Sequence, residues 1–210
     1  MDKKTIVSKI GELKSKKKDR KFAQSMEISV NFKEIDLESS DFKLNLNIPL
    51  PKGRGRDVNI GVFADGDMNV RAKKLSKFVL NKDELEKYAK DKRKMRKFAG
   101  SCHALIAQPD LMATIGKSWG IVLGPKGKMP QPVPPNADLA PVIDKIKNSV
   151  RIRSKKNPTI HALVGTENMS PEDLADNTLA VLSGIERQIP KDKIKSIYLK
   201  YTMSEPVELI

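Results

Sequence analysis

The chain has 210 residues, of which 39% are hydrophobic and 31% charged, and its 40 Lys and Arg against 26 Asp and Glu give a formal net charge of +14. No apolar run approaches the roughly 18 residues of a membrane span, and charges in the first twenty residues interrupt what would be the apolar core of a signal peptide. Such a positive excess opposes compaction unless a polyanion neutralises it, so nucleic acid or an anionic membrane is the natural partner.

The first quarter of the chain has the pattern of one helix and two one-sided strands. Ile6, Ile10 and Leu13 recur at helical spacing. Apolar and polar residues then alternate strictly over residues 26–32 and again over 44–50. Alternation of this kind predicts strands of a sheet that has one solvated face.

The pattern changes after residues 51–56, a run of Pro, Gly, Lys and Arg that is a hinge candidate. Continuous apolarity predicts a strand covered on both faces at 58–64. The following pattern predicts, in order, a helix at 68–79, a helix at 83–98, a strand at 104–107, a short helix at 109–115, a short strand at 121–123 and a helix at 138–150. Alternating strands and helices indicate an α/β Rossmann-like three-layer domain over 58–154.

One-sided elements return at the end of the chain. The sequence predicts a strand at 159–164, a helix over 170–185 that opens with Ser170-Pro171, and a strand at 197–203. An isolated two-stranded sheet is marginal in water. We therefore expect residues 1–57 and 155–210 to form one α+β outer domain, an antiparallel sheet with packed helices, which the α/β segment interrupts. The chain would cross between the domains at 53–57 and 153–157.

The sequence gives little support to metal or disulfide chemistry. Cys102 and His103 are adjacent, His161 is distant, and no metal-ligand spacing occurs. Cys102 is interpreted as a small buried strand residue. A single cysteine excludes an internal disulfide and suits a reducing cytoplasm. We expect a soluble intracellular protein with no metal and no cofactor.

The stretch LGPKGKMP at 123–130 suggests a possible catalytic loop, because phosphate-binding enzymes use glycine-lysine loops after strands. It lacks the spacing G-x-x-x-x-G-K-[ST], and the prolines at 130–135 prevent a helix from starting there, so the usual phosphate cradle is missing. GVFADG at 61–66 also fails the dinucleotide pattern. An α/β enzyme that handles a phosphate or nucleotide with the loop from Gly124 to Lys128 remains the alternative hypothesis.

Basic clusters are the stronger signal. Residues 82–97 (KDELEKYAKDKRKMRK) form a charged helix whose second half is almost all positive, equally compatible with a plain solvated face and with a phosphate contact. Aromatic residues make up only 5% of the chain, which argues against single-strand stacking platforms. A folded RNA that is read by its shape, 2′-hydroxyls and phosphates fits better.

LGPKGKMP resembles the signature LGP(R/K)GxMP of the L-one family of large-subunit ribosomal proteins. Lys21-Phe22, Ile160-His161-Ala162 and Tyr201-Thr202-Met203-Ser204 agree with the same family in order and spacing, and the stretch AQPDLM at 107–112 resembles its ATPDMM. The short length and Ser204 resemble the archaeal branch.

The resemblance implies a two-domain protein, the second domain inserted into the first, and no enzymatic activity. It implies that the protein is monomeric when free and binds large-subunit ribosomal RNA at the mobile stalk of cytoplasmic ribosomes, near the E site. There it would assist release of deacylated tRNA. It further implies translational repression through binding to the leader or coding region of its own mRNA.

When the family's RNA-binding positions are carried over residue by residue, the resemblance places the main RNA surface on the first domain. The matching positions are Lys21, Phe22, Ser25, Glu27, Thr159, His161, Gly165, Thr166, Thr202, Met203 and Ser204. Phe22 would offer a ring and Thr202 a hydroxyl, whereas a secondary RNA contact would involve Lys126, Lys128 and Arg153. The residues alone leave alternatives open, since Phe22 and Met203 also fit core positions and His161 fits a sheet edge.

Overall fold

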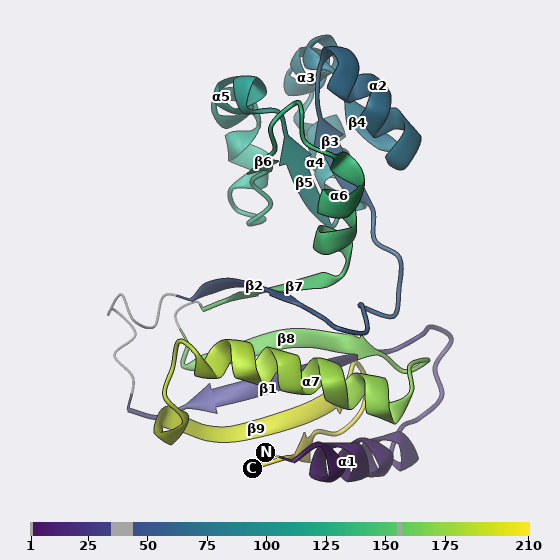
Figure 1. Cartoon of the computed structure of the whole chain (residues 1–210), viewed down its shortest axis with the longest axis vertical. Coiled ribbons are helices and arrows are strands. Elements are labelled where there is room, and N and C mark those ends of the chain that lie inside the picture. The colour runs from purple at the N-terminus through teal and green to yellow at the C-terminus, as the bar shows by residue number, and fades with distance from the viewer. Residues whose placement is uncertain (1, 35–43, 155–156) are drawn as a thin grey trace. The chain divides into compact units, whose positions relative to one another are not determined.

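The computed structural model describes residues 2–34, 44–154 and 157–210 (Figure 1). Contacts divide the chain into two compact units: a split unit, residues 1–56 with 148–210, and a middle unit, residues 57–147. Both units mix helices and strands. Within the described ranges, no helix has the length and apolarity that crossing a bilayer requires.

The sheet of the split unit joins the beginning of the chain to its end. Its strand order is β10-β9-β1-β8, all antiparallel. These strands are β1 (Ser25–Phe32), β8 (Thr159–Thr166), β9 (Ile194–Tyr201) and β10 (Val207–Glu208). Every second residue of β1, from Met26 to Phe32, is buried, as the alternation predicts. The N-terminal strand is therefore completed on both sides by strands from the last quarter of the chain.

Two helices cover the buried face of this sheet, α1 (Lys3–Ser15) and α7 (Pro171–Glu186), and they pack against each other (Figure 1). Ile6, Ile10 and Leu13 are fully buried, as their spacing predicts. Ser170 begins α7 by accepting a hydrogen bond from the Asp173 amide, and Pro171 occupies the first turn, where it needs no donor. The residues that alternate with the buried ones on β1, such as Glu27 and Ser29, are partly exposed, so the opposite face of the sheet is the polar one.

A separate two-stranded sheet corrects the expected boundary of the middle segment. β2 (Asn45–Pro49) pairs with β7 (Ser149–Arg153) and not with β1. The amphipathic stretch that we assigned to one helix ends in this strand, where Val150 and Ile152 are buried with the core of the split unit. Residues 148–154 therefore belong to the split unit, and the chain crosses at 147–148. Residues 155 and 156, within the expected crossing at 153–157, lie outside the described residues.

The sheet of the middle unit is parallel, in the order β4-β3-β5-β6, as the alternation of elements predicts. Its strands are β3 (Ile60–Phe63), β4 (Phe78–Leu80), β5 (Ala104–Ala107) and β6 (Gln131–Pro132). Side chains such as Val62 and Ile106 pack with α2 (Gly66–Leu75) and α6 (Leu139–Lys147). Phe63 and Leu105 point the other way, toward α3 (Lys82–Ala89), α4 (Lys92–Ser101) and α5 (Met112–Leu123). Helices thus cover both faces of the sheet.

Three predicted elements of this unit differ from the structure. Residues 121–123, expected as a strand, are the last turn of α5, which follows the short helix η2 (Pro109–Leu111). The predicted helix at 68–79 is α2 followed by strand β4. The predicted helix at 83–98 is two helices, because the Asp91 carboxylate accepts hydrogen bonds from the amides of Arg93 and Lys94 and so begins α4. Short apolar runs do not by themselves distinguish a buried strand from a buried helix.

Candidate nucleic-acid interface

The start of β1 and the ends of β8 and β9 meet at one end of the split-unit sheet. The Ser25 amide donates to Thr202 Oγ1 at 3.1 Å, and the Thr202 amide donates to the Ser25 carbonyl at 3.0 Å. Directly after β8, the Glu167 amide donates to the Gln24 carbonyl at 3.0 Å. Residues some 180 positions apart in the sequence therefore share one surface, which we call the strand-end surface: Lys21, Phe22, Ser25, Thr202, Met203 and Ser204.

Gln24 is the residue that organises this surface, and the sequence comparison by motif missed it. Its side chain is buried, its Oε1 accepts from the Met203 amide at 3.0 Å, and its Nε2 donates to the Lys18 carbonyl at 3.0 Å. One side-chain amide thus fastens the backbone of Lys18, four residues before Phe22, and that of Met203, next to Thr202. The only sequence signal was a polar residue at the position where the core alternation of β1 would place an apolar one.

Two large apolar side chains are exposed at this end of the sheet. Phe22 is 50% exposed and Met203 is 54% exposed, so the core interpretation of both residues is wrong. Met203 does not continue the alternation of β9, because that strand ends at Tyr201 and a turn follows in which the Ser204 amide donates to the Tyr201 carbonyl at 3.2 Å. An exposed aromatic ring beside hydroxyls and lysines offers a nucleotide a stacking surface, hydrogen-bond partners and positive charge.

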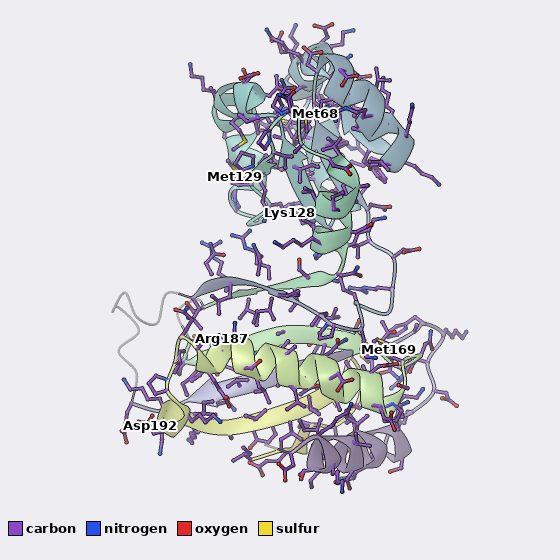
Figure 2. The ribbon with its side chains drawn as sticks, in the orientation of Figure 1. Met68, Lys128, Met129, Met169, Arg187 and Asp192 are labelled. Atoms are coloured by element: carbon purple, nitrogen blue, oxygen red, sulfur yellow. The ribbon has the colours of Figure 1, made fainter. Side chains whose placement is uncertain are left out.

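Basic residues in the last turn of α1 and just after it border the strand-end surface. Lys17 Nζ lies 2.7 Å from the Glu167 carboxylate, and this hydrogen bond lowers the pKa of Glu167. Lys14 Nζ donates to the carbonyl of Met169 at 3.1 Å, in the turn before α7 (Figure 2). These two lysines hold the end of β8 in place. Lys18 and Lys21 are exposed and can meet phosphates.

Other predicted residues lie farther along the polar face of the sheet. Glu27 stands opposite Lys200 on β9, and the exposed His161 stands opposite Ser29. Thr159 donates to the side chain of Asn31 at 2.9 Å. Asn31 is six residues along β1 from Ser25, about 20 Å at the usual rise per residue. The structure therefore does not bring Thr159 to the strand-end surface, whereas Glu27 and His161 lie between the two.

Gly165 and Thr166 support the surface from behind, since both are buried. A β-carbon on Gly165 would lie 2.5 Å from Leu174 Cδ2, so glycine is needed for α7 to pack here. Thr166 is 3% exposed and its hydroxyl donates to the Gly55 carbonyl at 3.2 Å. Neither side chain is part of the exposed surface.

The residues of the predicted secondary contact belong to other elements than those that form the strand-end surface. Lys126 and Lys128 follow α5 in the middle unit, where Figure 2 labels Lys128, and Arg153 lies on β7 opposite Asn45. Lys128 Nζ donates to the carbonyls of Ala99 and Cys102, at 2.9 and 2.5 Å. Burial, together with the charge of Lys126, lowers the pKa of Lys128. A lysine whose ammonium group donates to the last carbonyls of α4 acts as a helix cap.

We expect Lys128→Met to lower the free energy of unfolding of the protein by about 1–3 kcal/mol, because two buried carbonyls lose a charged donor. Chemical denaturation followed by circular dichroism measures this. Lys126→Met is the matched control, since Lys126 makes one exposed hydrogen bond to the Arg96 carbonyl at 3.3 Å and its loss should cost little. Equal stability of the two variants would contradict the capping role of Lys128.

Tyr201 lies beneath the strand-end surface with its side chain fully buried. Its hydroxyl has no hydrogen-bond partner among the described residues. Burial, reinforced by the charge of Glu167, raises the pKa of Tyr201 to about 12. The ring fills the core, but the hydroxyl is desolvated without compensation.

Tyr201→Phe is therefore expected to leave the stability unchanged or to raise it by about 1 kcal/mol, in contrast to most core substitutions. Urea denaturation of the two proteins tests this. A loss of 2 kcal/mol or more, on the order of a lost buried hydrogen bond, would show that the hydroxyl has a partner such as an internal water.

A net charge of +14 and a surface that combines an exposed ring, a thioether, hydroxyls and lysines define the class of nucleic-acid-binding proteins. The comparisons with known proteins agree with this class. The chain belongs to the Ribosomal protein L1p/L10e family, whose model matches residues 13–205. Proteins of this family are structural components and not enzymes, so the enzyme interpretation of the loop from Gly124 to Lys128 is rejected.

Archaeal relatives match along nearly their whole length. The chain is 41% identical over 211 residues to the Large ribosomal subunit protein uL1 of Methanothermococcus thermolithotrophicus, covering 100% of this chain and 99% of that protein. It is 43% identical over 211 residues to the protein of the same name from Pyrococcus horikoshii, covering 99% and 96%. The corresponding protein of Archaeoglobus fulgidus is 39% identical over 213 residues, covering 100% and 99%.

Proposed function

We propose that this protein is a structural component of the large ribosomal subunit and binds its ribosomal RNA through the strand-end surface. The observation that carries the proposal is the exposure of Phe22 and Met203, close in sequence to Ser25 and Thr202, whose hydrogen bonds join the two chain segments. Membership of a ribosomal protein family and relatives named as large-subunit proteins support it.

The chemistry of this surface suits a folded RNA. Stacking on an aromatic ring does not depend on base identity, because every base has a π-face. Thr202 Oγ1 uses one lone pair to accept from the Ser25 amide, and its second lone pair can accept a 2′-hydroxyl. Because the 2′-hydroxyl distinguishes RNA from DNA, the surface should select RNA by shape and ribose contacts, with Lys21 on a phosphate.

The finer functions follow the family resemblance. The RNA target would be the mobile stalk beside the E site, where the protein would assist release of deacylated tRNA from cytoplasmic ribosomes. The two compact units fit a two-domain plan in which only the split unit carries the main RNA surface. A similar RNA fold in its own mRNA would let the free monomer repress its own translation, and addition of the protein to a cell-free translation of that message should then reduce the yield.

The test is to measure affinity for a stalk fragment of large-subunit ribosomal RNA and for a generic RNA duplex, each over a range of salt concentrations. Binding to the stalk fragment should be much tighter. Lys21→Ala should flatten the log–log salt slope by about 0.7–0.9, the amount for one phosphate. Thr202→Val should weaken binding with little change in slope. Equal affinity for both RNAs would overturn the proposal.

A further inference from the structure

A cavity of about 440 Å³ opens beside β4, the edge strand of the middle-unit sheet. It lies between that strand and helices α3 and α4, on the basic stretch 82–97 that the strand-end surface does not use. The side chains that matter for its chemistry are Lys77, Phe78, Glu84, Tyr88, Lys94 and Lys97.

Aromatic rings form one wall of this cavity. Phe78 and Tyr88 are each partly exposed, and each packs edge-on against Phe98, with ring centroids 6.1 and 6.2 Å apart. Behind them, Trp119 is fully buried and stacks on Tyr88 at 6.3 Å with an interplanar angle of 18°. The exposed rings are thus held by a rigid aromatic core, although aromatic residues are scarce in the chain as a whole.

Positive charge surrounds the opening. Lys77 precedes β4, and Lys94 and Lys97 lie one turn apart on α4; all three are exposed. Lys94 Nζ is 3.8 Å from the Asp91 carboxylate, an exposed pair that holds it weakly. Among the residues that line the cavity, Glu84 alone is acidic, and one of its oxygens accepts from the Asn81 amide at 3.0 Å. Three cations against one carboxylate favour an anionic ligand.

We propose that this cavity binds one unpaired nucleotide of an RNA strand, with the base against Phe78 and Tyr88 and the flanking phosphates on Lys94 and Lys97. Partly exposed aromatic rings beside lysines are the combination that holds single-stranded RNA, and Glu84 can accept a hydrogen bond from an exocyclic amine. The site is separate from the strand-end surface. An acidic peptide adding to the edge of β4 is the competing occupant, but a strand of three residues offers such a peptide few backbone hydrogen bonds.

The single tryptophan of the chain gives a local reporter, because Trp119 stacks on Tyr88 in the wall of the cavity. The full-length protein is titrated with a single-stranded RNA of ten nucleotides while Trp119 fluorescence is followed. A saturable change is expected. Lys97→Glu should weaken the affinity for this RNA about tenfold or more, because a charged hydrogen bond to a phosphate is replaced by repulsion.

The matched control is Lys145→Glu, an equal charge change at an exposed position of α6, on the other face of the same sheet. This variant should bind as the wild type does, and Phe22→Ala should leave the Trp119 response unchanged. Circular dichroism checks that all variants are folded. The proposal is overturned if RNA binds without altering Trp119 fluorescence, if AMP alone binds as tightly as the oligomer, or if an acidic peptide gives the response and RNA does not.

Discussion

Replacing Phe22 by alanine is expected to weaken binding of the stalk RNA fragment by about 5- to 150-fold, the range that corresponds to 1–3 kcal/mol for one base stacked on an aromatic side chain. The ring is half exposed and does not belong to the buried core, so its truncation opens no cavity there. Stability should therefore stay nearly constant. Filter binding or fluorescence anisotropy at fixed salt measures the effect.

Ile121→Ala is the matched control for Phe22, because Ile121 is a large apolar side chain exposed by 67% in the middle unit. It removes exposed apolar surface away from the strand-end surface and should not change affinity for the stalk fragment. Equal losses of affinity in the two variants would show that non-specific contact with exposed apolar side chains, and not stacking at Phe22, accounts for binding. If Phe22→Ala bound the stalk fragment with unchanged affinity, the ring would not be part of the RNA-binding surface.

Asn177→Leu is expected to have the largest effect on stability, about 3–4 kcal/mol, because it leaves three backbone groups without partners at about 1–3 kcal/mol for each group that stays buried. The side chain is fully buried on α7. Its Oδ1 accepts from the Lys52 amide at 3.0 Å, and its Nδ2 donates to the carbonyls of Gly53 and Val164, at 2.9 and 2.8 Å. Equilibrium denaturation in urea measures the change.

The neighbouring Thr178→Val supplies the control. Thr178 is equally buried, but its hydroxyl donates to the Leu174 carbonyl four residues back in the same helix, at 2.7 Å. That carbonyl lies within the helical hydrogen-bond pattern, so the loss should stay near 1 kcal/mol. If Asn177→Leu cost no more than Thr178→Val, the anchoring of residues 52–53 to α7 would contribute nothing to stability.

The Asn177 hydrogen bonds also change the interpretation of the hinge candidate. Gly53 and Gly55 have positive φ angles, 66° and 72°, which favour glycine. The carbonyl of Gly53 accepts from Asn177, and that of Gly55 accepts from Thr166. The glycines that the sequence offered as a flexible crossing are therefore fastened to the split unit. Their conformational freedom is used to make a tight turn and not to keep the segment loose.

Local pattern by itself determined most of the secondary structure, and the family resemblance named the six residues of the strand-end surface. Alternating burial in β1 and the spacing of Ile6, Ile10 and Leu13 follow directly from the period of each element, because one face must leave water. The amino-acid sequence already shows the hydroxyls, the aromatic ring and the excess of basic residues. It also shows the likeness of the stretch at 123–130 to a ribosomal protein family. None of these needs coordinates, since each depends on residue type and on neighbours a few positions away.

The tertiary structure alone decided which of these residues act together. Gln24 became the centre of the strand-end surface because segments some 180 residues apart meet there, and no local period records such a pairing. Lys128 caps α4 because two carbonyls at the end of that helix lie within reach of its ammonium group, a contact that the local sequence does not record. Whether a side chain is buried, which group it bonds and which surface it joins depend on contacts between segments far apart in the sequence. These properties are therefore known only once the chain is folded.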